Sequence, residues 1–251
     1  MNYNWNWSVF WDPSPEGVGT YLDTLFLGLG WTLATGLAAG ALALFLGTIV
    51  GTATTAPNKA VRILANSYIE LFRNIPLLAQ MFIWYFVLPE LLPLNISNWI
   101  KQSYYSSFYT AVVSLGLYTA SPIAVQINSG INALGRGQVF AGMALGFTLP
   151  QTYRYVLLPV VFRILIPPLT SEFMGVIKNS AVALTIGLVE LTARSRAMQE
   201  YTFQTFEAFT AATVMYIVIS LSVVKVMSGI EKLVAIPGFV TTVSAETSEN
   251  T

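Results

Sequence analysis

The stretch from Thr24 to Asn58 reads TLFLGLGWTLATGLAAGALALFLGTIVGTATTAPN and contains no charged residue. A helix needs about 20 predominantly apolar residues to cross the hydrocarbon core of a bilayer. The stretch exceeds that length and predicts a first transmembrane helix. Six glycines recur along it: Gly28, Gly30, Gly36, Gly40, Gly47 and Gly51. Small residues of this kind let a neighbouring helix approach closely.

The composition of the whole chain agrees with a membrane protein and excludes several function classes. Of 251 residues, 55% are hydrophobic and 10% are charged, against about 25% charged residues in a soluble domain. The 12 basic and 12 acidic residues cancel, so we expect no nucleic-acid partner. Without cysteine or histidine the chain lacks thiolate chemistry, a Ser-His-Asp triad and most transition-metal sites. We expect no catalytic residue and no metal.

Further apolar segments follow the first. A second helix is predicted from about Ala65 to Leu88 and a third from Phe108 to about Ile127, with Pro122 near its end as a kink or stop. The prolines and polar residues between these helices cannot satisfy their backbone in lipid, so the segment from residue 88 to 107 should lie outside the hydrocarbon. A last span is predicted from about Ala208 to Val226.

The fourth span is irregular by sequence. The apolar run from Tyr155 to Thr170 is interrupted by Pro159, Arg163 and the pair Pro167-Pro168. It is therefore not an ordinary lipid-facing helix, and its irregular backbone should be covered by protein or line a cavity. The next apolar run, Ser180 to Val189, is too short to span and predicts a re-entrant or interfacial segment.

The segments together predict an all-α integral membrane protein with five transmembrane helices. We expect a periplasmic N-terminal segment over residues 1–20, a transmembrane domain over 21–236 and a flexible cytoplasmic tail over 237–251. Five spans place the termini on opposite sides, and positive residues favour the cytoplasm. With the N-terminus outside, the inner loops hold Lys59, Arg62, Arg136, Arg154 and Lys232. Lys101, Arg194 and Arg196 lie outside and count against this orientation.

The polar stretch before the fourth span carries an informative spacing. Phe140-Ala141-Gly142 is followed by three residues and Gly146, then by nine residues and Val156-Leu157-Leu158-Pro159. Small residues at 141 and 142 let a helix lie close against a partner, and Gly146 supplies a backbone that turns through positive φ. From these residues alone, an ordinary cytoplasmic connector remains an alternative.

This spacing resembles the cytoplasmic coupling motif of importer permeases in the ATP-binding-cassette (ABC) superfamily. That motif reads Glu-Ala-Ala, three residues, Gly, nine residues, Ile-x-Leu-Pro, so Phe140 and Gly142 depart from it. The stretches Tyr68–Pro93 and 135–191 resemble polar amino-acid permeases. The segments NWNWSVF, beginning at Asn4, and KNSA, beginning at Lys178, resemble the glutamate/aspartate members. The resemblance extends from about residue 4 to residue 237.

The resemblance implies a bacterial inner-membrane permease that imports polar amino acids, glutamate and aspartate foremost, by alternating access. It implies a coupling helix seated on an ATPase subunit, with these contact residues: Ala141, Gly142, Leu145, Gly146 and Pro159. It implies a dimer of ATPase subunits, which hold the ATP and Mg²⁺, a second and non-identical homologous permease, and a periplasmic amino-acid-binding protein. No cofactor is implied in this chain, which has no GxxxxGK[ST] loop for ATP phosphates.

Polar residues within the apolar segments are candidates for a translocation path. Glu70 and Arg73 share a helix face and form either a structural ion pair or, with Asn74, part of a gate. Lys178, Asn179 and Ser180 precede the short apolar run.

Related permeases commonly carry Asp where this chain has Asn179. Lys178 could attract an anionic substrate, and Asn179 could donate a hydrogen bond to it. The alternative is a helix cap made by Asn179 or Ser180. Glu190 and Arg194, four apart, predict a surface ion pair.

Two other function classes remain as alternatives. An ion-coupled secondary amino-acid transporter usually carries two internal repeats with paired broken helices, and the five spans show no such repeat. An intramembrane enzyme would need paired carboxylates here, and the spacing of Glu70 and Glu172 does not support one.

Overall fold

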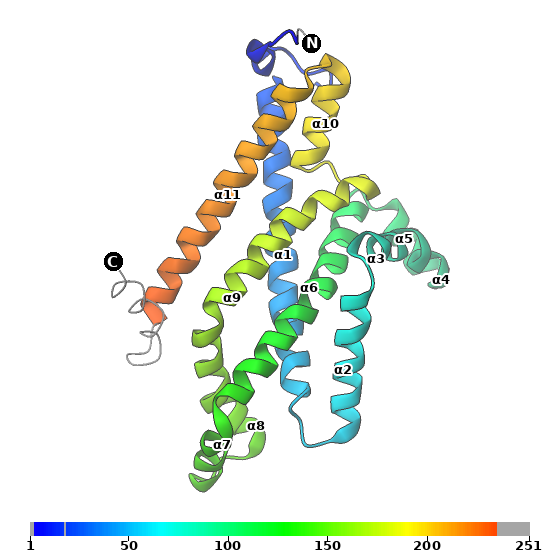
Figure 1. Ribbon diagram of the computed structural model, residues 1–251. Coiled ribbons are helices and arrows are strands. Elements are labelled where there is room, and N and C mark those ends of the chain that lie inside the picture. Colours follow the sequence, from blue (N-terminus) through cyan, green and yellow to red (C-terminus); the bar gives the residue numbers. More distant parts are fainter. Residues whose placement is uncertain (1–2, 18, 235–251) are drawn as a thin grey trace, which may run out of the picture.

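The computed structural model describes residues 3–17 and 19–234, which fold almost entirely as helices (Figure 1). Four helical segments are long and apolar enough to cross a membrane: Tyr21–Ala53, Ser106–Ala133, Leu149–Ile186 and Thr205–Val234. A bent pair, Lys59–Asn74 with Leu77–Leu91, makes a fifth if it is one span. The prediction of an all-α membrane fold is therefore confirmed. The predicted tail over 237–251 lies outside the described residues.

The helices follow one another in this order: η1 Trp7–Trp11, α1 Tyr21–Ala53, α2 Lys59–Asn74, α3 Leu77–Phe82, η2 Ile83–Val87, α4 Leu88–Leu91, α5 Leu94–Gln102, α6 Ser106–Ala133, α7 Gly135–Ala144, α8 Leu149–Thr152, η3 Tyr153–Leu157, α9 Leu158–Asn179, η4 Ser180–Ile186, α10 Leu191–Thr202 and α11 Thr205–Val234. The segments η1 and η4 are 3₁₀ helices, and η2 and η3 are π-helical.

Helix α1 begins at a capping box, in which Thr20 and Asp23 exchange hydrogen bonds, and it packs along α6 more extensively than any other pair of helices. Glycine permits this packing. A Cβ atom added at Gly51 would lie 2.6 Å from the carbonyl oxygen of Ala124. The predicted close approach is confirmed at five of the six glycines of α1, whereas Gly30 faces open space.

The second span differs from the continuous helix predicted from Ala65 to Leu88. Helix α2 ends at Asn74, and the chain bends by 103° before it continues as α3. The reason lies in Pro76, because a proline disfavours helical geometry at the residue before it. Ile75 is accordingly extended, with φ −98° and ψ 127°.

Prolines inside the other spans do not end them, so the stop that the sequence allowed at Pro122 does not occur. Helix α6 continues past Pro122 to Ala133, and α9 runs without a break through Pro167 and Pro168. Neighbouring helices allow prolines in membrane helices by satisfying or covering the freed backbone groups. Beyond Pro122, the side chains of Ile123 and Ile127 are fully buried among those of α6 and α9, and this packing holds α6 helical.

Figure 1 shows two ends of the molecule. The turn between α1 and α2 lies at the same end as α7 and α8, whereas the N-terminal segment lies at the opposite end beside α10 and the start of α11. The N-terminal segment is fastened there by a buried carboxylate, because Glu207 on α11 accepts hydrogen bonds from the Tyr3 hydroxyl and the Asn6 amide. Its tryptophans, Trp5, Trp7 and Trp11, are exposed, as expected at a membrane–water interface.

Candidate functional site

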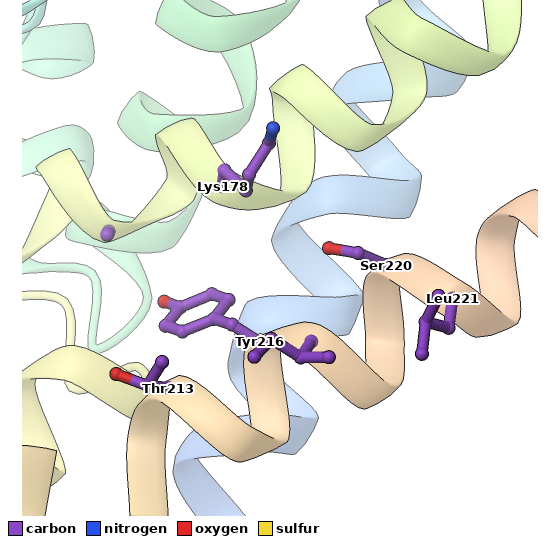
Figure 2. Close-up of a pocket in the computed structure, with 7 residues that line it drawn as sticks. Lys178, Thr213, Tyr216, Ser220 and Leu221 are labelled. Atoms are coloured by element: carbon purple, nitrogen blue, oxygen red, sulfur yellow. The ribbon is translucent and has the colours of Figure 1, made fainter. Parts of the chain in front are cut away.

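A pocket of about 390 Å³ lies between the end of α9 and the middle of α11. Lys178, in the last turn of α9, is the charged residue that lines this pocket. Figure 2 shows Tyr216 and Ser220 reaching toward α9 from α11, and the Lys178 ammonium group pointing away from them. We call it the Lys178 pocket. The sequence-based prediction placed Lys178 beside a path, and the structure places Lys178, which is exposed, at the edge of a concave and mostly apolar site.

The two residues predicted beside Lys178 behave differently. Ser180 is completely buried, and its hydroxyl donates a 2.7 Å hydrogen bond to the carbonyl oxygen of Ile177. Asn179 is half-buried and does not line the pocket. Of the two residues offered as a helix cap, Asn179 precedes η4 and makes no side-chain cap, whereas Ser180 is the C-cap residue of α9 and its hydroxyl satisfies a carbonyl of the last turn.

A network behind the pocket holds Tyr216 in place. Its hydroxyl donates a 2.8 Å hydrogen bond to Glu190 and lies 3.0 Å from the hydroxyl of Thr192. Glu190 is completely buried and caps α10, accepting from the amides of Thr192 at 3.0 Å and Ala193 at 2.8 Å. Burial raises the pKa of the Glu190 carboxyl, and the hydrogen bonds oppose that shift.

The predicted surface pair between Glu190 and Arg194 is therefore wrong. The carboxylate oxygens of Glu190 accept hydrogen bonds from two α10 amides and from the Tyr216 hydroxyl. Arg194 instead forms a salt bridge with Glu16 of the N-terminal segment. Burial lowers the pKa of the Arg194 guanidinium. The spacing of four residues would favour an ion pair only if both residues lay within one helix. Glu190 instead precedes the first turn of α10 and acts as its N-cap.

The predicted gate residues Glu70, Arg73 and Asn74 lie in the last turns of α2, exposed, and none of them lines the Lys178 pocket. Among the described residues Glu70 and Arg73 form no salt bridge, so the structural-pair alternative is not supported. The sequence reasoning missed Gln80, which is buried at the bend. Its amide donates to the carbonyl oxygens of Phe72 and Ile75 at 2.9 and 2.8 Å, satisfying the end of α2.

The stretch predicted to couple to a partner forms an elbow of three parts: α7, a turn and α8. Gly146 makes the turn with φ +85°, a conformation that costs other residues about 1–2 kcal/mol. The amide of Phe147 closes it with a 3.2 Å hydrogen bond to the Gly142 carbonyl. A capping box between Thr148 and Gln151 then starts α8.

The elbow divides its residues into an inner and an outer face. Gly142 is buried, and an added Cβ atom would lie 2.7 Å from Cγ2 of Thr152 in the same chain. Large apolar side chains point outward instead, with Phe140 63% exposed and Leu145 77% exposed. Ala141 and Pro159 are exposed as well. Exposed apolar side chains grouped on a short helix are typical of a surface that binds another protein.

The sequence-based prediction did not include Glu172, a carboxylate within a membrane span, among the candidates for the translocation path. Glu172, half-buried on α9, accepts a 2.7 Å hydrogen bond from the side-chain amide of Gln126 on α6. An acidic residue alone in an apolar run was the available signal, because ionisable groups in a span tend to be functional.

Comparison with known proteins agrees with this geometry. Residues 23–236 match the family described as "Binding-protein-dependent transport system inner membrane component". The chain is 42% identical to the glutamate/aspartate import permease protein GltJ of Escherichia coli (strain K12), over 95% of this chain and 98% of that protein. It is 28% identical to the glutamine transport system permease protein GlnP of the same strain, over 90% and 96%.

A solved structure supports the same fold. An amino acid ABC transporter crystallised with histidines matches with a TM-score of 0.70 and 28% identity, over 84% of this chain and 94% of that chain. The resemblance therefore extends over most of the helical arrangement and is not limited to one motif.

Proposed function

Because this chain belongs to the family of binding-protein-dependent transport system inner membrane components, we propose that it is the membrane-spanning permease of an importer for acidic amino acids, glutamate and aspartate. As a member of that family with apolar spanning helices it is a multi-pass inner-membrane protein. The observation that supports this choice of substrate is the 42% identity to a glutamate/aspartate import permease over nearly the whole chain. A glutamine permease is more distant, at 28%.

The Lys178 pocket supports an anionic substrate. Lys178 is the charged residue that lines a pocket whose walls are mostly apolar, and a lysine ammonium group attracts an anion by Coulomb interaction. Among the described residues no acidic side chain lines this pocket. An acidic amino acid carries a net negative charge at neutral pH and would be favoured there over a neutral one.

Energy would come from a separate ATPase dimer, because this chain lacks a phosphate-binding loop. In this proposal Ala141 of α7 and Leu145, the residue that follows α7, contact one ATPase subunit. Gly146 and Pro159 shape the elbow behind them. Gly142 contributes by letting α7 pack on Thr152. Movement of the elbow then shifts α9, which continues directly from it, and with α9 the Lys178 pocket.

The proposal includes a second, homologous permease and a periplasmic binding protein as partners. It places the N-terminus and α10 outside and the elbow inside, so the ATPase meets the elbow and the binding protein meets the α10 end. The family match favours this importer over the ion-coupled secondary transporter that the composition left open, because the matched family depends on binding proteins.

The test is ATP hydrolysis by the full complex reconstituted in proteoliposomes. The binding protein is supplied empty or loaded with glutamate, aspartate or glutamine at equal concentration. We expect glutamate and aspartate to stimulate hydrolysis several-fold over the empty protein and glutamine to stimulate it less. Equal stimulation by all three contradicts the acidic specificity, and no stimulation by any contradicts the amino-acid importer.

A further inference from the structure

A second concave site, unrelated to the Lys178 pocket, lies at the opposite end of α9. It is a groove of about 500 Å³ between the end of α1 and the elbow. Apolar residues from both sides line it: Ile49, Ala53, Pro57, Leu149, Pro150 and Leu158. We call it the elbow groove.

Among the described residues, Arg154 is the one charged residue that lines the elbow groove. It forms no salt bridge there, and its guanidinium lies 5.7 Å from the ring centre of Tyr155. The sequence contains no acidic residue between Asp23 and Glu70 or between Glu90 and Glu172, which covers both segments that form the groove. The Arg154 guanidinium therefore has no counter-ion from those segments.

Another cation sits at the rim. Arg62 donates 2.9 Å hydrogen bonds to the carbonyl oxygens of Ala56 and Pro57, two residues that line the groove. Lys59 is exposed nearby, in the first turn of α2. The groove mouth thus carries an uncompensated positive charge.

The groove follows the end of α1, a helix long and apolar enough to cross a membrane, and continues past it. It starts at Thr48, which lies about 7 Å inside the end of α1 at the usual rise per residue, and it reaches Pro57, beyond that end. The hydroxyl of Thr52, another lining residue, is buried without a hydrogen-bond partner. An apolar groove that ends at a cation matches an anionic phospholipid, which has apolar acyl chains and a charged headgroup at one end.

We propose that the elbow groove binds one anionic phospholipid, with an acyl chain along Ile49 and Leu158 and the phosphate on the Arg154 guanidinium. Arginine suits this role because its fork of N–H donors matches phosphate oxygens in a bidentate manner. Basic pockets between transmembrane helices are sites for anionic headgroups. A zwitterionic lipid is disfavoured because its ammonium group would lie near Arg62 at the rim.

The proposal is tested by native mass spectrometry of the full chain, titrated with phosphatidylglycerol or phosphatidylcholine of the same acyl chains. We expect one phosphatidylglycerol to bind about tenfold more tightly than phosphatidylcholine, which corresponds to about 1.4 kcal/mol. Arg154→Gln should remove this preference and Arg154→Lys should keep part of it. Lys59→Gln is the matched control, because Lys59 is at the same end but does not line the groove, and it should keep most of the preference.

A second variant tests the groove itself. Ile49→Trp fills the groove from an exposed position of α1 and should lower the affinity for both lipids. Equal affinity of the native chain for the two lipids overturns the proposal, as does an unchanged preference in Arg154→Gln. If Arg154→Gln instead abolishes ATPase-subunit binding while lipid affinities stay unchanged, Arg154 serves the protein partner and the lipid site is rejected.

Discussion

The hydroxyl of Tyr216 on α11 donates a 2.8 Å hydrogen bond to the carboxylate of Glu190, the residue that caps α10. The same region includes α1, because the hydroxyl of Thr32 accepts from the amide of Leu191 at 3.1 Å. Three helices are thus joined around one buried carboxylate, and the wall of the Lys178 pocket depends on that junction through Tyr216.

Replacing Glu190 by alanine should weaken the fold at the α10 end. Two amides of α10 and the Tyr216 hydroxyl would lose their acceptor in a buried place, which costs about 2 kcal/mol or more. Tyr216→Phe removes one donor and should cost about 1 kcal/mol. The measurement is thermal unfolding of the purified chain in detergent. Tyr201→Phe, at an exposed tyrosine of α10, is the control and should leave the unfolding temperature unchanged.

The same carboxyl should make stability depend on pH. Burial raises the folded-state pKa of Glu190 above its ordinary value of 4.5. The folded state therefore holds this proton to a higher pH than the unfolded state. The stability gained is full below 4.5 and is lost as pH rises through the raised pKa.

Glu190→Gln does not titrate, so its unfolding temperature should fall less than that of the native chain between about pH 4 and about pH 8. Identical pH profiles for the two proteins would show that the Glu190 carboxyl has the same affinity for protons in both states.

The elbow should tolerate asparagine but not valine at Gly146. The backbone there is left-handed, with φ +85°, and an added Cβ atom meets nothing within 4 Å. Any loss of activity in a Gly146 variant therefore comes from backbone strain and not from a steric clash. Asparagine adopts this conformation far more readily than a β-branched residue. We expect Gly146→Val to lower substrate-stimulated ATP hydrolysis several-fold and Gly146→Asn to keep most of it.

A change at Leu145 separates contact with the ATPase from the shape of the elbow. Leu145→Asp alters an outward side chain with no strained backbone. It should reduce co-purification of the ATPase subunit while the chain remains in the membrane. Normal co-purification and normal transport in Leu145→Asp would remove the elbow from the proposed ATPase contact.

Cysteine labelling tests the orientation and the bent second span together. The native chain contains no cysteine, so single substitutions at two exposed positions, Ser8 and Ala144, give clean signals. With three crossings between them, an impermeant thiol reagent added to spheroplasts should label Ser8→Cys and not Ala144→Cys. The reverse pattern overturns the orientation. Labelling of both means that the α2–α3 pair does not cross the membrane.

The preference of the Lys178 pocket for an anionic substrate should weaken when the residue next to Lys178 becomes acidic. Asn179→Asp places a carboxylate next to Lys178 and offsets its attraction for an anion. Uptake of glutamate and aspartate should then fall by more than uptake of glutamine, if the system carries it. Asn95→Asp, the same change at an exposed position of α5 outside the pocket, should change none of them. A proportional fall for every amino acid would assign selectivity to the binding protein.

The spans could be predicted from the sequence because hydropathy is a local property. The charge-free run from Thr24 to Asn58 is sufficient to require a membrane helix, and α1 occupies nearly that range. The turn at Gly146 was also predictable, since a glycine between two short polar segments favours positive φ. Lys178 could be picked out because a cation among apolar residues is costly and therefore informative.

The sequence by itself thus determined a helical membrane protein, the approximate spans and the elbow. Only the tertiary structure decided that α6 and α9 continue through their prolines and that Glu190 joins α1, α10 and α11. The physical reason is that packing partners decide whether a helix continues through a proline, which groups a buried carboxylate binds, and which helix lies against a row of glycines. Those partners, such as Tyr216 for Glu190 and Ala124 for Gly51, lie far away in the sequence and adjacent only in the fold.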